Sequence, residues 1–194
     1  MIPSTVKRLL DIGCSNGATS ALAKEMLGID HIVGVELFPD AAKTARTRLD
    51  EVIEGNIETL TLPYSEGYFD CILCADVLEH TQNPWQVLTK LRSLLSPNGV
   101  LIASIPHIGH IVPLLKIAFD RLEYEESGIL DKTHLRFFTW HTIKLMFKDT
   151  GYSIDSVSFN KSRSWKFVLF RIFTLGLLER LTISQYLVRV KRLS

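Results

Sequence analysis

Short apolar runs that alternate with stretches of helical period constrain the fold of this chain most strongly. Residues 6–12, His31–Glu36 and Phe69–Ala75 are runs of strand length, and Ala18–Leu27, between the first two, ends at Gly28 as a helix does. This alternation is typical of βαβ units on a parallel sheet. Right-handed crossovers then predict an α/β fold with an open, doubly wound, Rossmann-like sheet, mostly parallel, with helices on both faces.

The remaining predicted elements continue the alternation of strands and helices except at two insertions. We predict further helices at 39–49, 84–96 and 139–150, and strands at 51–55, 100–105, 152–159 and 185–191. Residues 107–138 interrupt the pattern without a clean period, and such long interruptions are usually functional. The expected organisation is a single domain over residues 1–194 with insertions at about 107–138 and 161–181.

Composition excludes disordered and fibrous classes, because 46% of the 194 residues are hydrophobic and 22% are charged. The three cysteines, Cys14, Cys71 and Cys74, cannot all pair, and the last two lie in an apolar run, so we expect buried thiols in a reducing compartment. The first residues lack the apolar stretch of a signal peptide. A cytoplasmic protein is predicted.

Charge is divided unevenly along the chain. Residues 1–160 carry 14 basic and 20 acidic side chains, whereas residues 161–194 carry 8 basic side chains and Glu179 alone as an acid. Within that basic part, residues 165–181 are strongly apolar but too short and interrupted to span a bilayer. The alternatives are a lid over a binding site, a dimer contact or a peripheral membrane contact. Basic residues alternate with apolar ones there, so nucleic-acid binding is not expected.

The ends of the predicted strands are the informative positions, because ligands of open α/β sheets bind there. After the first strand, Gly13 and Gly17 permit a tight turn into the helix. A dinucleotide fingerprint would need glycines at the positions of Ser15 and Ala18, so a nicotinamide oxidoreductase is disfavoured. Asp11 at the strand end would repel a pyrophosphate and attract a cationic ligand. An ordinary glycine turn is the alternative for this segment.

Three more strand ends carry polar residues at similar spacing. Glu36 closes an apolar strand 23 residues after Gly13, where an acid can accept both hydroxyl hydrogens of a ribose. Asn56 and Ile57 follow the next strand and suit an adenine ring. The fourth end runs from Ala75 to His80.

At these motifs the chain resembles the class I S-adenosylmethionine-dependent methyltransferases, small-molecule branch, over about residues 6–106. It is similar there to ubiquinone-pathway and polysaccharide-linked members. The resemblance implies S-adenosylmethionine as cofactor and a last antiparallel strand. It implies cofactor contacts from Asp11, Gly13, Cys14, Ser15, Asn16, Gly17, Glu36, Leu37, Asn56, Ile57, Cys74, Ala75 and Val77. Ser15 and Asn56 depart from the glycine and aspartate common in the family.

The activity that this resemblance implies is methyl transfer to a small-molecule, lipid or sugar acceptor, at oxygen, driven mainly by alignment of the reactants. A hydroxyl acceptor benefits from a general base, and His134, in the motif DKTHLRFFT, and His107 are the predicted catalytic residues. Structural hydrogen bonds or helix caps are the alternative roles of these histidines. The alternative functions are a non-catalytic cofactor-binding or membrane-associated partner protein and the oxidoreductase.

The spacing of Asp76, Glu79 and His80 places three possible metal ligands on one helical face. The segment is similar to the metal-binding acid-x-x-Glu-His segment of ubiquinone-pathway O-methyltransferases. The favoured interpretation is that Glu79 and His80 cap and orient the loop before Pro84. No metal site is therefore predicted.

Overall fold

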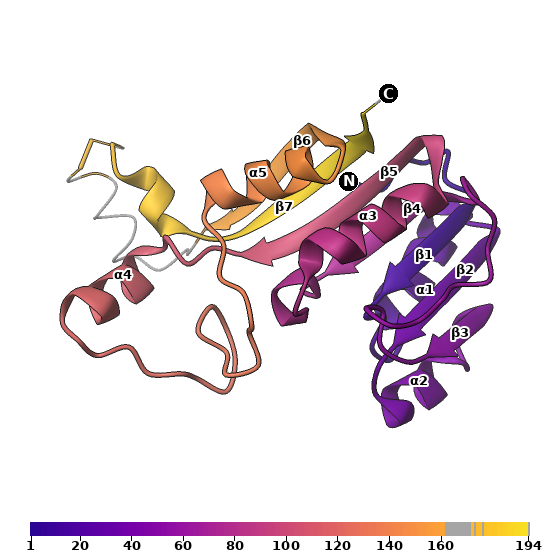
Figure 1. The fold of residues 1–194 in the computed structure, drawn as a ribbon, viewed down its shortest axis with the longest axis horizontal. Helices are drawn as coiled ribbons and strands as arrows, with labels where there is room; N and C mark the ends of the chain where they lie inside the picture. The colour runs from indigo at the N-terminus through magenta and orange to yellow at the C-terminus, as the bar shows by residue number, and fades with distance from the viewer. Residues whose placement is uncertain (162–171, 173, 176, 194) are drawn as a thin grey trace.

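The computed structural model describes residues 1–161, 172, 174–175 and 177–193, and its centre is one seven-stranded sheet (Figure 1). The strand order is β3-β2-β1-β4-β5-β7-β6. β1 to β5 pair in parallel, whereas β7 is antiparallel to both of its neighbours. The strands are β1 (Arg8–Ile12), β2 (His31–Glu36), β3 (Glu51–Glu54), β4 (Phe69–Ala75), β5 (Leu95–Pro106), β6 (Tyr152–Lys161) and β7 (Ile183–Arg192).

Local signals in the sequence set the helix boundaries. Gly28, with a φ of 66°, ends α1, and the Asn83 side chain accepts a hydrogen bond from the Gln86 amide at the start of α3. Thr139 opens α5 with a reciprocal capping box to Thr142. The helices are α1 (Ala18–Leu27), α2 (Pro39–Ala45), α3 (Pro84–Leu94), α4 (Ile111–Ala118) and α5 (Trp140–Asp149), with 3-10 turns η1 (Leu78–His80) and η2 (Glu179–Thr182).

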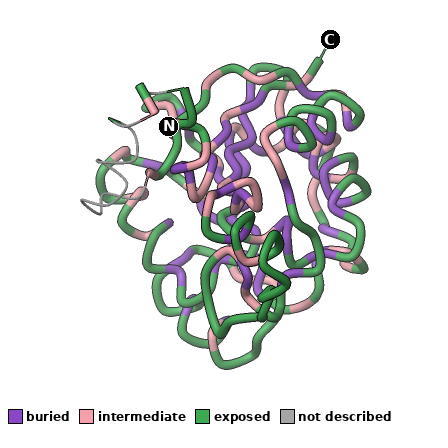
Figure 2. The backbone as a smooth tube through the Cα atoms, turned by 90° about the vertical axis from the view of Figure 1, so that its left-hand side faces the viewer, coloured by how far each residue is buried: buried purple, intermediate pink, exposed green. Residues whose placement is uncertain are grey.

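The core forms two layers because successive strand residues point to opposite faces of the sheet. Leu10 packs with α3 and α5 on one face, while its neighbour Leu9 belongs to the cluster that includes residues of α1 and α2 on the other. In Figure 2 the buried segments run through the interior of the molecule, and exposed segments lie around its outside. The predicted doubly wound sheet, with helices on both faces and an antiparallel last strand, is confirmed. The three cysteines are free and buried, as expected.

The sequence did not predict α4, which lies inside the irregular stretch 107–138. This helix extends away from the sheet at the lower left of Figure 1, and Pro113 is its one buried residue. Val112, Leu115 and Ile117 are each between 43% and 51% exposed. The helix has only eight residues and carries Pro113 near its start, so its pattern is too short and interrupted to indicate a helix from the sequence. α2 is also shorter than predicted and ends at Ala45.

Most of the apolar insertion at 165–181 lies outside the described residues. Of its described part, Leu175 and Leu177 are strongly exposed. Among the described helices, none is long and apolar enough to cross a membrane. Several basic side chains of the C-terminal region are held by the sheet itself, since Arg189 and Lys191 of β7 form ion pairs with Asp155 of β6 at 2.5 and 2.6 Å.

Candidate active site

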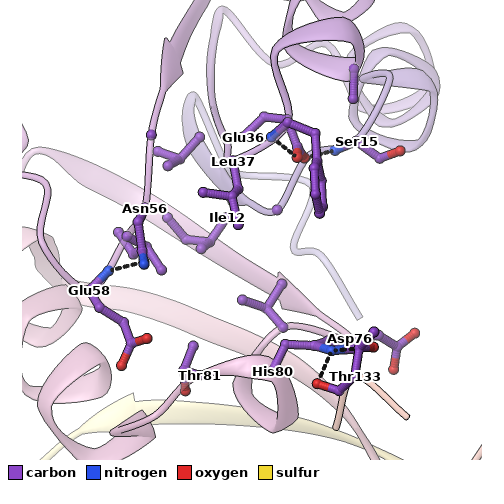
Figure 3. Close-up of a pocket in the computed structure, with 17 residues that line it drawn as sticks. Ile12, Ser15, Glu36, Leu37, Asn56, Glu58, Asp76, His80, Thr81 and Thr133 are labelled. Carbon is purple, nitrogen blue, oxygen red and sulfur yellow. Dashed lines mark hydrogen bonds between the residues drawn. The ribbon is translucent and has the colours of Figure 1, made fainter. Parts of the chain in front are cut away.

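A cavity of about 480 Å³ opens at the carboxyl ends of β1, β2 and β4 (Figure 3). Its volume falls in the range of small-molecule and cofactor sites. Three carboxylates line it, and none of the described residues in its wall is Lys or Arg. The wall consists of Ile12, Gly13, Ser15, Val35, Glu36, Leu37, Phe38, Ala41, Gly55, Asn56, Ile57, Glu58, Asp76, Val77, His80, Thr81 and Thr133.

The turn between β1 and α1 forms the floor of the cavity through its backbone. Gly13 has a φ of 68°, and a Cβ at this position would lie 2.6 Å from Cγ2 of Val77. Only glycine therefore allows the turn to approach Val77 so closely. Ser15 also adopts a left-handed φ, of 50°, where an L-residue is strained. Gly13 and Ser15 of this turn both belong to the cavity wall.

Glu36 holds this turn in place from the end of β2. Its carboxylate is 5% exposed and accepts hydrogen bonds from the Ser15 amide at 2.7 Å and the Phe38 amide at 2.9 Å (Figure 3). Hydrogen bonds to a carboxylate are among the stronger ones in proteins. Each carboxylate oxygen keeps acceptor capacity for a ligand hydroxyl, and the side chain is fixed before any ligand arrives.

The β3 side of the cavity is tied to the loop after β4. Oδ1 of Asn56 accepts from the Glu58 amide at 2.9 Å, so the Asn56 amide nitrogen remains available as a donor (Figure 3). The Glu58 carboxylate accepts from the amides of Gln82 and Asn83 at 3.1 and 2.9 Å. These bonds connect two walls that are about 25 residues apart in the sequence.

The structure brings seven of the thirteen predicted cofactor residues to the cavity wall and leaves six outside it. Those in the wall are Gly13, Ser15, Glu36, Leu37, Asn56, Ile57 and Val77. Those outside it are Asp11, Cys14, Asn16, Gly17, Cys74 and Ala75. Cys74 is fully buried, and Cys14 is buried with its Sγ in the space beside Gly34 of β2.

Asp11 is placed differently from the expectation that it faces a cationic ligand. It is 5% exposed and accepts a hydrogen bond from the Ser20 hydroxyl of α1 at 2.5 Å. Burial, with a smaller contribution from the negative charge of Glu36, raises the pKa of Asp11 to about 6, although the Ser20 bond opposes the shift. Asp11 therefore fastens α1 to the sheet and lies outside the cavity wall.

The two predicted catalytic histidines are also outside the cavity wall. His107 is buried, stacks edge-on against Tyr186 with ring centroids 5.1 Å apart, and its Nδ1 finds no hydrogen-bond partner among the described residues. Burial lowers the pKa of His107. His134 is 9% exposed and lies against His80. The catalytic role of both side chains stays a prediction.

Sequence reasoning missed several wall residues, including His80 and Thr133. The sequence suggested loop orientation or metal ligation for His80 but no cofactor contact. Thr133 lies in the irregular stretch 107–138, where no strand end draws attention to it. The structure joins the two because the amides of Leu135 and Arg136 donate to the carbonyl of Glu79, at 2.8 and 3.0 Å. A loop far along the chain thereby reaches η1.

Comparisons with known proteins agree with this architecture. The sequence profile of the methyltransferase domain family matches residues 2–157. The ubiquinone biosynthesis O-methyltransferase of Histophilus somni is 37% identical over 108 residues, which are 52% of this chain and 45% of that protein. The Xylella fastidiosa protein of the same name is 27% identical over 85% of this chain and 68% of its own length.

A solved structure extends the likeness to nearly the whole chain. The SAM-dependent methyltransferase of Archaeoglobus fulgidus superposes with a TM-score of 0.71 at 19% identity, covering 97% of this chain and 87% of that one. At this identity the superposition shows the shared fold. The profile match covers most of the chain, whereas the chain spans less than half the length of the Histophilus relative.

Proposed function

The chain belongs to the class I S-adenosylmethionine-dependent methyltransferases, and we propose that its cavity binds S-adenosylmethionine and that the methyl group passes to an oxygen atom of a small-molecule, lipid or sugar acceptor. The observation that carries this proposal is the Glu36 carboxylate, which the Ser15 and Phe38 amides fix at the cavity wall. An acid held in this way suits the two hydroxyls of a ribose.

The charge of the wall favours a sulfonium cofactor over a dinucleotide. Glu36, Glu58 and Asp76 line the cavity, and its described wall has no basic side chain to meet a pyrophosphate. Positive charge at sulfur is attracted by such a wall, whereas two phosphates are repelled. The wall therefore disfavours a nicotinamide dinucleotide as cofactor.

The proposed reaction is a direct displacement. A lone pair of the acceptor oxygen forms the new bond to the methyl carbon, the carbon–sulfur bond breaks, and sulfur keeps its electron pair as a neutral thioether. Holding the two reactants in line can lower the barrier by about 7–11 kcal/mol, so alignment by the cavity is the main contribution of the protein. The acceptor hydroxyl loses its proton to a base or to water.

The names of related proteins support an oxygen acceptor. The Histophilus and Xylella relatives are both named O-methyltransferases of ubiquinone biosynthesis. The exposed apolar side chains of α4 would suit contact with an acceptor that has apolar surface. The alternative function is cofactor binding without catalysis.

Calorimetric titration of the full chain with S-adenosylhomocysteine and, separately, with NADH tests the cofactor. We expect binding heat with the first compound and none with the second. Incubation with S-adenosylmethionine and an acceptor panel then tests the reaction, with released S-adenosylhomocysteine as the readout. Failure to bind S-adenosylhomocysteine contradicts the proposal, and binding without turnover on any acceptor class favours the non-catalytic alternative.

Glu36→Ala should weaken S-adenosylhomocysteine binding by about 100-fold, because it removes the acceptor of two charge-assisted hydrogen bonds from the ribose hydroxyls, worth about 1.5 kcal/mol each. It also removes the acceptor of the Ser15 and Phe38 amides, which holds the turn in place. Glu54→Ala is the matched control, since Glu54 ends the neighbouring strand β3 but lies outside the cavity wall. Equal affinity of the two variants would refute the role of Glu36.

A further inference from the structure

We propose that a second cavity, at the start of β7, binds a small organic acid that carries a flat ring. Its volume is about 300 Å³, at the lower end of the range for small-molecule sites. The first cavity, proposed above for the cofactor, shares no described wall residue with it. The wall of the second cavity consists of Trp140, Val157, Phe159, Lys161, Glu179, Arg180, Ile183 and Tyr186.

The pairing of β6 with β7 explains why these side chains gather at one place. Phe159 is paired with Tyr186, and Lys161 is paired with Ile183. Residues directly opposed in an antiparallel pair lie on the same face of the sheet. Tyr186 and Ile183 belong to the core cluster that includes α5, so Phe159 and Lys161 lie on that face as well. η2 leads directly into the start of β7 at the left of Figure 1 and adds Glu179 to the wall.

Three aromatic rings form the apolar part of the wall. Trp140, the first residue of α5, stacks on Tyr186 with ring centroids 4.8 Å apart and an angle of 26° between the ring planes. Phe159 is 43% exposed, although its partner Tyr186 is buried. Aromatic rings attract one another in offset or edge-to-face arrangements, beyond the area that they bury. The exposed ring of Phe159 beside the stacked pair therefore suits a flat ring of a ligand.

The charged residues of this wall favour an anion. They are Lys161, Glu179 and Arg180, so positive charge exceeds negative charge by one. Lys161 is ion-paired with Glu179, and its Nζ lies 4.6 Å from the centre of the Phe159 ring. Arg180 is exposed and has no ion-pair partner within the described part of the chain. A guanidinium can donate two parallel hydrogen bonds to one carboxylate, so Arg180 is the expected partner of an acidic group.

The two cavities therefore differ in electrostatic character. Three carboxylates and no Lys or Arg line the described wall of the first cavity, whereas the wall of the second has an excess of positive charge. A cleft lined by charge of one sign concentrates ligands of the opposite sign. A sulfonium cation is thus favoured in the first cavity, and an organic anion is favoured in the second.

β7 connects the two cavities through neighbouring residues. Gln185 donates to Asp76 in the wall of the first cavity at 2.5 Å, and the next residue, Tyr186, lines the second cavity. The ring of Tyr186 also meets that of His107, a predicted catalytic residue, with centroids 5.1 Å apart. We therefore expect the methyl acceptor to be a ring acid that also carries a hydroxyl. This last step rests on the proposed function, whereas binding in the second cavity does not.

Calorimetric titration of the full chain with 2-naphthoate, without cofactor, tests the second cavity. We expect one 2-naphthoate per chain, and at least 10-fold weaker binding of 2-naphthamide, which has a similar shape but no negative charge. Saturating S-adenosylhomocysteine should leave the affinity for 2-naphthoate unchanged, because the two cavities have different walls.

Two wall variants should weaken this binding, and each has a matched control. Arg180→Gln should weaken it by about 10-fold, through loss of a charge-assisted hydrogen bond, and Phe159→Leu by about 5-fold, through loss of ring packing. Arg121→Gln and Phe119→Leu should keep the wild-type affinity, since both residues are exposed and lie outside both walls. All four replaced side chains are exposed, so we expect normal folding, which melting temperatures check.

A kinetic measurement tests the acceptor class. With 3-hydroxy-2-naphthoate as acceptor, Arg180→Gln should raise KM by about 10-fold, whereas KM for the corresponding amide should not change. An equal increase for both acceptors would show that Arg180 does not recognise the acidic group.

Four results would overturn the binding inference. The wild-type chain shows no binding heat with 2-naphthoate. The amide binds as tightly as the acid. Arg180→Gln keeps the affinity of Arg121→Gln. S-adenosylhomocysteine displaces 2-naphthoate, which would place the anion in the first cavity. By contrast, a chain that binds 2-naphthoate but not S-adenosylhomocysteine would refute the proposed function and support the second cavity as an independent site.

Discussion

Strands β1–β5 and the segment after Pro106 contribute to the site in different ways. The first region presents backbone turns at strand ends, at Gly13 and Ser15, and one acid, Glu36, that holds them. The second region contributes His134 and Thr133 from a loop whose position depends on hydrogen bonds to η1. One side of the cavity is therefore fixed by the sheet and its turns, whereas the other depends on side chains that a loop carries.

The largest loss of stability and of ligand binding is expected on substitution of Gly13 in the first region. Gly13→Ala places a Cβ 2.6 Å from Val77 Cγ2 and strains a φ of 68°. We expect about 3 kcal/mol of lost stability from the left-handed conformation and the clash together, and loss of S-adenosylhomocysteine binding. Urea denaturation and calorimetry measure the two effects.

Gly28→Ala is the matched control for Gly13. Its φ of 66° is almost the same, but nothing lies within 4 Å of the added Cβ. This variant should lose only about 1–2 kcal/mol from backbone strain and keep its cofactor affinity. Equal losses in the two variants would show that the close approach to Val77 is unimportant.

The pH dependence of stability tests how much the buried, ionised carboxylate of Asp11 in the first region destabilises the fold. The pKa of this carboxyl is raised from 3.8 to about 6 on folding, so the folded chain holds the proton more tightly. The contribution of Asp11 to the free energy of unfolding is greatest below pH 4, falls between pH 4 and 6 and is then constant. Asp11→Asn should therefore stabilise the protein by about 3 kcal/mol at pH 7.

The gain from Asp11→Asn should shrink as the pH falls and vanish below pH 4. Urea denaturation of both proteins at pH 3.5, 5 and 7 measures it. A gain that is independent of pH would show that folding does not shift the pKa of Asp11 and that the effect arises from packing.

A smaller effect is expected where the two regions are joined. Tyr152 of β6 donates from its buried hydroxyl to the carbonyl of Leu88 in α3 at 3.0 Å. Tyr152→Phe should cost about 1 kcal/mol, the usual contribution of one hydrogen bond. S-adenosylhomocysteine affinity should stay unchanged, because the contact lies outside the cavity wall, and an altered affinity would mean that the two regions are coupled through this bond.

Much of the first region could be predicted from the sequence because its signals are local. α1, β2 and β4 begin and end as predicted, since apolar period and glycine or polar stops coincide there. The second region was predicted less completely. α4 is short and contains Pro113, so its pattern does not indicate a helix, and the insertion at 165–181 lies mostly outside the described residues.

The charge division along the chain also takes on a different meaning in the structure. Arg189 and Lys191 contribute to the basic C-terminal balance, but both are paired with Asp155 across the β6–β7 ladder. They therefore support the sheet edge rather than forming an open basic surface. Lys161 is similarly paired with Glu179.

By itself, the sequence determined the alternation of strands and helices and the strand ends that carry Gly13, Glu36 and Asn56. It did so because hydrophobic period and turn residues are local properties of the chain. Only the tertiary structure decided which side chains face the cavity, since Asp11 and Cys14 lie at a predicted strand end yet point into the core. It alone brought His134 to His80, 54 residues earlier in the chain, because the contact depends on hydrogen bonds to the Glu79 carbonyl that no spacing in the sequence encodes.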